Sequence, residues 1–257
     1  MLLIPQHVLF GWISALFWPL LRTTGVFLTA PILGSSALPV LFRVLLATMI
    51  AICLAAWGGP WPAIPASVPA IILEGLIQIA CGSGIGLFGQ IIVSAVAGGG
   101  EIAGAALGTN FATVTGLTPT PQPPVTYSIF YWAGMMVYLG LGGLFWTIEA
   151  LDRSFKTMPG GIPTSGALLD LGHFMGAILV SGTLIALPAL AVSLALNAVT
   201  GLANALAPQL NIFSVGFPLL FLGGLWIIAS SLFFIQPIAG NLLLHGMKVL
   251  ANWVGAT

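Results

Sequence analysis

No aspartate, glutamate, lysine or arginine occurs anywhere between Leu171 and Met247. A water-soluble domain is about one-quarter charged, whereas this whole chain is 4% charged and 59% hydrophobic. The apolar runs are long and do not alternate with polar residues, which is typical of helices rather than of a transmembrane barrel. We therefore predict an all-α, polytopic helical membrane protein.

The composition also excludes several classes of function. Five basic and five acidic residues give a net charge of zero, so the chain lacks a basic surface for nucleic acid. Cys53 and Cys81 both lie in apolar runs, and we predict two buried thiols rather than a disulfide. His7, His173 and His245 show no metal-ligand spacing, and no serine has the surroundings of a catalytic nucleophile. We therefore predict no metal, no cofactor and no enzymatic activity.

Six apolar runs are long enough to cross a bilayer core of about 30 Å as helices of roughly 20 residues. They cover residues 8–30, 38–57, 69–97, 125–148, 171–196 and 212–236. Pro19 and Pro188 lie inside two of these runs, where we expect kinks or shorter helices. The positions of Arg153, Lys156 and Lys248 favour cytoplasmic termini.

Three charged residues lie where a simple membrane span should not hold them. Arg22 and Glu74 interrupt apolar runs, and Glu101 lies in the Gly/Ala-rich stretch after the third run. A charged side chain at the centre of a bilayer costs roughly 3 kcal/mol, so we expect an internal partner for Arg22. For Glu101 two readings stay open. In the first, its carboxylate faces water or lipid headgroups. In the second, the carboxylate pairs with a basic residue such as Arg22 or faces an internal channel.

Two glycine patterns predict close helix packing. The run from Gly84 to Gly89 matches the dinucleotide-binding pattern G-x-G-x-x-G, but that motif needs a preceding strand and a helix N-terminus. Because the run sits inside a long apolar segment, we interpret it as a helix contact. Gly100, Gly104 and Gly108 recur every four residues and predict a smooth helix face beside Glu101.

The segment 109–124 combines Phe111 with several threonines and prolines and carries no charge. It is too irregular for a helix. Either it is an external connection, or it lies at membrane depth, where loops are tolerated only when buried in protein or lining an aqueous path. The composition leaves both readings open.

Taken in order along the chain, these motifs resemble the FliR family of flagellar export-gate proteins, whose virulence counterparts are the YscT/SpaR proteins. The matching blocks are Arg22 to Pro31 with Pro39 and Arg43; Glu74-Gly75, then Gly100 to Gly104, Gly108 and Phe111; Gly142-Gly143, Ser154-Phe155 and Pro159-Gly160; and Pro188, Gly201, Asn204, Ala207 to Phe213 and Gly216 to Pro218. Each block alone is weak, but their order and spacing cover nearly the whole chain.

The resemblance implies a structural and gating subunit of a type III protein export channel in the bacterial inner membrane, at the flagellar basal body. Its partners would be FliP-like and FliQ-like subunits, an FlhB-like switch protein and unfolded export substrates in transit. The helices would be kinked and arranged as slanted hairpins, with residues 1–170 FliP-like and 171–257 a FliQ-like hairpin within a single export-gate domain. The alternatives are the equivalent subunit of a virulence injectisome, or a self-sufficient small-solute transporter.

The resemblance also implies roles for individual residues. Phe111 is the candidate plug residue, with Thr113 and Thr115 nearby, because an apolar constriction can close a pore by dewetting. The candidates for polar contacts within the complex are Arg22, Arg43, Glu74 and Glu101. The candidate packing and turn residues are Gly100, Gly104, Gly108, Pro208, Gln209 and Asn211. The chain departs from the family pattern at Phe145, Ala205 and Leu220, where polarity or charge is lost.

Overall fold

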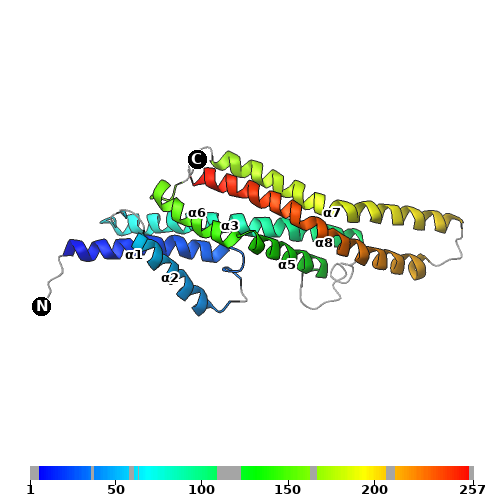
Figure 1. Ribbon diagram of the computed structural model, residues 1–257, viewed down its shortest axis with the longest axis horizontal. Helices are drawn as coiled ribbons and strands as arrows, with labels where there is room; N and C mark the ends of the chain where they lie inside the picture. The colour runs from blue at the N-terminus through cyan, green and yellow to red at the C-terminus, as the bar shows by residue number, and fades with distance from the viewer. Residues whose placement is uncertain are drawn as a thin grey trace. The chain divides into compact units, whose positions relative to one another are not determined.

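The computed structural model describes residues 6–35, 38–57, 61–62, 64–108, 123–162, 167–206 and 212–254. Within these ranges the regular structure is helical and contains no strand, so the all-α prediction is confirmed. The helices are α1 (Gln6–Thr29), α2 (Val40–Trp57), α3 (Val68–Ala106), α5 (Val125–Gly140), α6 (Gly143–Thr157), α7 (Ala167–Leu206) and α8 (Ile212–Trp253) (Figure 1).

The predicted count of six spans is wrong. Among the described residues, three helices are long and apolar enough to cross a membrane: α3, Gly172–Leu202 of α7 and Leu222–Trp253 of α8. A fourth is counted if α5 and α6 are taken as one broken span. The run 125–148 was predicted as one helix, but it is divided between α5 and α6. The division lies at Gly142, which adopts a left-handed backbone with φ of 76°. Helix α2 is apolar but short.

The long helices exceed what a single straight crossing requires. Helices α3, α7 and α8 contain 39, 40 and 42 residues, which at 1.5 Å per residue gives each about 60 Å. The hydrocarbon core is about 30 Å thick, and ordinary tilting cannot absorb twice that length. Part of each helix therefore lies outside the hydrocarbon. Pro19 and Pro188 both lie inside continuous helices, so of the two expectations, kinks or shorter helices, the kinks remain the prediction.

The structure consists of two compact units. The first is formed by Met1–Ile91, Gly142–Phe174 and Leu244–Thr257, and the second by Ile92–Leu141 and Met175–Leu243. Helices α3, α7 and α8 contribute residues to both units. These boundaries differ from the division at residues 170 and 171, which rests on the family resemblance and remains a proposal.

In the first unit, glycines bring the backbones of α1 and α3 into contact. A side chain at Gly25 would overlap the carbonyl oxygen of Ile79, and one at Gly82 would overlap the carbonyl oxygen of Arg22. Across the same contact Thr29 Oγ1 donates a hydrogen bond to the carbonyl oxygen of Ser83 at 2.8 Å. Small residues that allow such an approach are the usual basis of helix packing in membranes.

The G-x-G-x-x-G run lies inside continuous α3, and the helix-packing interpretation is confirmed. A Cβ at Gly84 would lie 2.8 Å from the ring of Trp253, and one at Gly86 would lie 2.8 Å from the backbone nitrogen of Ala30. Both cysteines are free thiols, as predicted. Cys81 is buried, but Cys53 is exposed, so the expected burial is wrong for Cys53.

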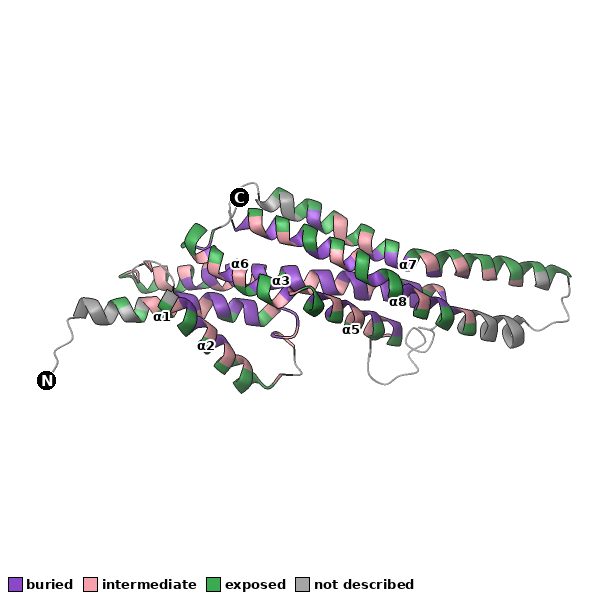
Figure 2. Ribbon diagram, in the orientation of Figure 1, coloured by how far each residue is buried: buried purple, intermediate pink, exposed green. Residues whose placement is uncertain are grey.

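In the second unit the described hydrophobic core is joined by a polar contact, from Ser193 Oγ to the carbonyl oxygen of Ala106. The core consists of Val96, Ala103, Leu107, Phe130, Ile185, Ala186, Ala189, Ile227, Ile228, Ile235 and Ala239. Glycines allow close contacts here too: a side chain at Gly99 would lie 2.7 Å from the carbonyl oxygen of Gly182, and one at Gly100 would overlap the Phe130 side chain. Buried residues follow much of the length of α3, while α2 is mostly exposed or half-buried (Figure 2).

Candidate functional site

A buried arginine on α1 forms a polar site that joins several segments of the described chain. Arg22 is 0% exposed. Its backbone faces α3, because a Cβ at Gly82 would overlap the carbonyl oxygen of Arg22. The close approach of the two helices therefore directs the Arg22 side chain along α3 toward Gln78, one turn before Gly82.

Four hydrogen bonds hold the Arg22 guanidinium. Nε donates to Oε1 of Gln78 at 2.7 Å, and Nη1 donates to Oγ of Ser154 at 2.9 Å. Nη2 donates to the carbonyl oxygens of Met158 at 2.9 Å and of Pro159 at 3.3 Å. The side chain of one α1 residue thus joins α3, α6 and the segment that follows α6.

Aromatic and amide groups complete this Arg22 cluster, which we define as Arg22, Gln78, Ser154, Phe155, Met158 and Pro159. The guanidinium carbon lies 4.2 Å from the ring centroid of Phe155, a cation–π contact. Trp61 packs edge-on against Phe155, with ring centroids 5.1 Å apart. Gln78 Nε2 donates a further hydrogen bond to the carbonyl oxygen of Pro159 at 2.9 Å.

The backbone after α6 is shaped to present its carbonyl oxygens. Gly161 has φ of 77°, and its N–H donates to the carbonyl oxygen of Met158 at 2.9 Å. A Cβ at Gly161 would lie 3.1 Å from Cγ2 of Ile77 and 3.5 Å from Nη2 of Arg22. Glycine is therefore required here both for the left-handed backbone and for the space beside the guanidinium.

All of the described partners of Arg22 are uncharged. An internal partner was expected, and the structure supplies an amide, a hydroxyl and two carbonyls in place of the Glu101 carboxylate that we considered. A buried charge costs much less when its hydrogen-bonding capacity is satisfied. An arginine is protonated at all relevant pH values and this one is enclosed, so its chemistry is positional rather than catalytic.

Sequence reasoning missed most of this site. Ser154, Phe155 and Pro159 belong to blocks that resemble the family, but no role was assigned to them. Gln78 carried only a weak signal, as a polar residue in an apolar run four positions after Glu74. The contacts join residues 56 to 137 positions apart, and sequence spacing does not reveal such pairs.

The other predicted site residues lie in different surroundings. Arg43 is half-buried on α2, and its Nε is buried without a hydrogen-bond partner among the described residues. Glu74 is half-buried and Glu101 is exposed, both on α3. Gly100 packs against Phe130.

Gly104 is buried on α3, and Gly108 ends the described stretch with φ of 72°. The remaining predicted site residues lie outside the described part of the chain: Phe111, Thr113, Thr115, Pro208, Gln209 and Asn211.

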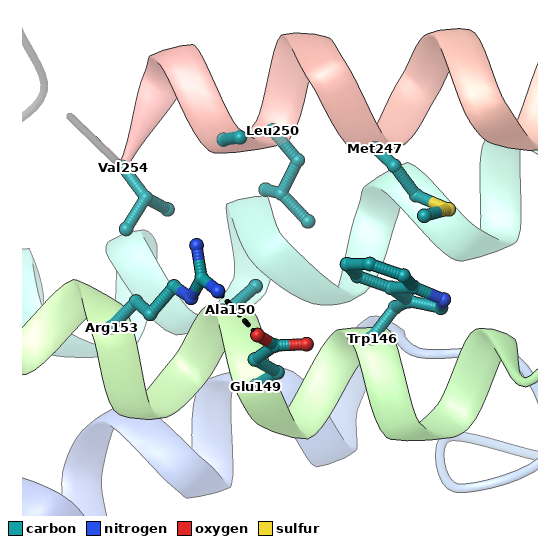
Figure 3. Close-up of a pocket in the computed structure, with 8 residues that line it drawn as sticks. Trp146, Glu149, Ala150, Arg153, Met247, Leu250 and Val254 are labelled. Atoms are coloured by element: carbon teal, nitrogen blue, oxygen red, sulfur yellow. Dashed lines mark hydrogen bonds and ion pairs between the residues drawn. The ribbon is translucent and has the colours of Figure 1, made fainter. Parts of the chain in front are cut away.

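Ion pairs lie on the exposed face of α6. Arg153 pairs with Glu149 at 2.5 Å, and Lys156 pairs with Asp152 at 2.7 Å. Beside the first pair is a cavity of about 40 Å³ between α6 and the end of α8, lined by Trp146, Leu250 and others (Figure 3). The cavity has room for only a few water molecules. Exposed pairs of this kind contribute little to stability, so we place the candidate site at the Arg22 cluster.

Comparisons with known proteins cover almost the whole chain. Residues 13–246 match the family described as bacterial export proteins, family 1. The flagellar biosynthetic protein FliR of Escherichia coli (strain K12) is 34% identical over 259 residues, covering 98% of this chain and 97% of that protein. The FliR proteins of Pectobacterium carotovorum subsp. carotovorum and Aquifex aeolicus (strain VF5) are 30% and 27% identical, covering 94% and 91% of this chain and 93% and 91% of their own lengths. The chain therefore belongs to family 1 of the bacterial export proteins, the family of the flagellar biosynthetic proteins FliR.

Proposed function

We propose that this chain is a structural and gating subunit of the flagellar type III protein export channel, which helps unfolded flagellar subunits to cross the membrane. The observation that carries the proposal is the similarity to FliR proteins along nearly the full length of both chains. The fold agrees with it, because long apolar helices that extend beyond the hydrocarbon suit a subunit of an assembly that is only partly embedded in the bilayer.

The proposed setting is the bacterial inner membrane at the flagellar basal body. The proposed partners are FliP-like and FliQ-like subunits and an FlhB-like switch protein, with residues 1–170 FliP-like and 171–257 a FliQ-like hairpin. The chain acts without catalysis. Its contribution is to hold helices in place around the export path, while other components drive transport.

Within that assembly we assign different roles to the charged residues. Arg22 braces the chain internally, because every described partner lies in the same unit and none of its surface is exposed. Glu74 and Glu101 offer carboxylates to neighbouring subunits, since both retain accessible surface on α3. Pro208, Gln209 and Asn211 remain candidate turn residues by resemblance.

We further propose that Phe111, with Thr113 and Thr115, contributes to a plug that closes the resting pore. A pore wide enough for an unfolded chain must exclude ions at rest, and an apolar constriction does this by dewetting. Replacing Phe111 with glycine should increase ion leakage through the assembled complex in liposomes. Unchanged resting conductance in F111G would count against the plug.

The function is tested by an in-frame deletion, scored for swimming in soft agar and for secreted hook and filament proteins. Loss of both, restored by the wild-type gene on a plasmid, is the expected result. Normal swimming with loss of effector secretion would assign the chain to an injectisome instead. Normal swimming together with normal secretion would refute the proposal.

A further inference from the structure

Helix α2 is exposed or half-buried along most of its length (Figure 2). Seven of its apolar residues are each more than half exposed: Val40, Leu41, Phe42, Val44, Leu45, Met49 and Ile52. At about 100° per residue these side chains cover an arc of about 200° around the helix. Ala47, Ala51 and Leu54 are buried along one edge of this arc.

This outer arc does not have the features of a helix-packing face. A packed helix usually buries a stripe about 100° wide. The close helix contacts elsewhere in this chain are made through glycines such as Gly82 and Gly100, but α2 contains no glycine. Bulky Val, Leu, Phe, Met and Ile side chains over a wide arc are suited to fluid acyl chains.

Grooves lie on both flanks of α2. The groove between α1 and α2 has a volume of about 400 Å³ and is lined mainly by apolar side chains, including Leu20, Phe27 and Val44. A second groove, of about 470 Å³, lies between α2 and α6 and is lined by apolar residues such as Leu46 and Met49 together with Asp152 and Lys156.

Arg43 supplies the polar end of the first groove. It is among the residues that line this groove, and its Nε is buried without a partner among the described residues. It is the fourth residue of α2, about 5 Å from the start of the helix, and near a helix end a long basic side chain reaches the headgroup level. A guanidinium matches the geometry of a phosphate and binds it through two parallel hydrogen bonds.

We infer that the groove between α1 and α2 binds one phospholipid, with its phosphate on Arg43 and an acyl chain along Leu20, Phe27 and Val44. The outer arc of α2 then faces the surrounding lipid. This inference goes beyond the proposed function, because it requires a membrane but no export partner.

The test is native mass spectrometry of the full-length chain, purified from membranes and titrated with dioleoylphosphatidylglycerol. Wild type should bind one lipid, and the affinity for this lipid should be at least about ten-fold lower in R43Q, since a hydrogen bond to a charged group is lost. R153Q is the matched control, because Arg153 is an exposed basic residue on α6, and this variant should bind as wild type. Dioleoylglycerol, which lacks the phosphate, and inorganic phosphate, which lacks the chains, should each bind at least ten-fold more weakly.

A second pair of variants tests the groove without changing its charge. V44W fills the groove and should reduce lipid binding as R43Q does. I52W should not, because Ile52 is similarly exposed on the same helix but lines neither groove. Circular dichroism checks the helix content of each variant. If V44W fails to fold, R43K replaces it in the test. R43K keeps the positive charge and should bind the lipid more tightly than R43Q.

Three results would overturn the inference. They are wild-type lipid binding in R43Q, binding of free phosphate as tight as that of the phospholipid, and photocrosslinking of position 44 to a carboxylate-bearing protein helix instead of lipid. Normal flagellar secretion in R43Q would leave the proposed function intact, so the two proposals fail separately.

Discussion

The two units of this protein use different means to pack helices. The first unit encloses a guanidinium that makes four directional hydrogen bonds to neutral groups. The described core of the second unit is made of apolar side chains such as Phe130 and Ile235, with glycines that allow close contact. Directional bonds fix the position of a loop and three helices at once, whereas apolar packing mainly fixes spacing. The first unit should therefore tolerate substitution less well than the second.

The largest expected effect is at Arg22. In R22M the apolar stem remains, but the acceptors on Gln78, Ser154, Met158 and Pro159 lose their donors. Each unsatisfied buried acceptor costs about 1–3 kcal/mol, so we expect a loss of about 3 kcal/mol or more in the free energy of unfolding. R22K should recover only part of this loss, because an ammonium lacks the planar fork of five donors. Thermal unfolding of the purified chain measures both, and wild-type stability in R22M would contradict the account.

The next effect compares glycine contacts in the two units. G82A should destabilise by about 1–3 kcal/mol, because the new Cβ overlaps the backbone of Arg22, which cannot move aside. G100A meets only the Phe130 side chain, so truncating that ring in a G100A/F130L double variant should restore part of the stability.

G98A is the matched control for both variants. A Cβ at Gly98 meets nothing within 4 Å, and alanine is the better helix former by about 1 kcal/mol. Equal stability of G82A and G98A in the same unfolding assay would contradict the close backbone contact between α1 and α3.

The smallest expected effect is at the exposed ion pairs of α6. R153Q removes the pair with Glu149, and the side chains of both residues are more than 40% exposed. Such pairs are worth about 0.3–0.5 kcal/mol. The variant should unfold close to the wild-type temperature, and the small difference should shrink further in 1 M salt. A loss as large as that of R22M would show that burial does not determine how much each arginine contributes to stability.

The fold class and the family could be predicted from the sequence, because both depend on patterns along the chain. The absence of charge between Leu171 and Met247 predicted a helical membrane protein, and ordered motifs indicated the family. The span count was too high because hydropathy shows where an apolar run lies but not how long its helix is, and α2 is too short to count as a span. The left-handed turn at Gly142 likewise breaks a run that composition presents as continuous.

The site was predicted only in part, for a physical reason. Arg22 was visible because an isolated charge in an apolar run is expensive and needs a partner. Its partners were not visible, because a carbonyl oxygen belongs to every residue and the hydroxyl of Ser154 lies 132 positions away in the chain. Which carbonyls face the guanidinium depends on the turn at Gly161, and that turn is a property of the folded chain.

The most direct test of the account is complementation of the deletion strain with wild type, R22M and R153Q, with secreted hook and filament proteins quantified at equal cell density. The two variants each remove one arginine from the first unit, one enclosed and one exposed. The account predicts that R153Q secretes as wild type and that R22M secretes less than wild type, because the hydrogen bonds that join α1, α3 and α6 are lost. Wild-type secretion by R22M would contradict the claim that the Arg22 cluster holds the export subunit together.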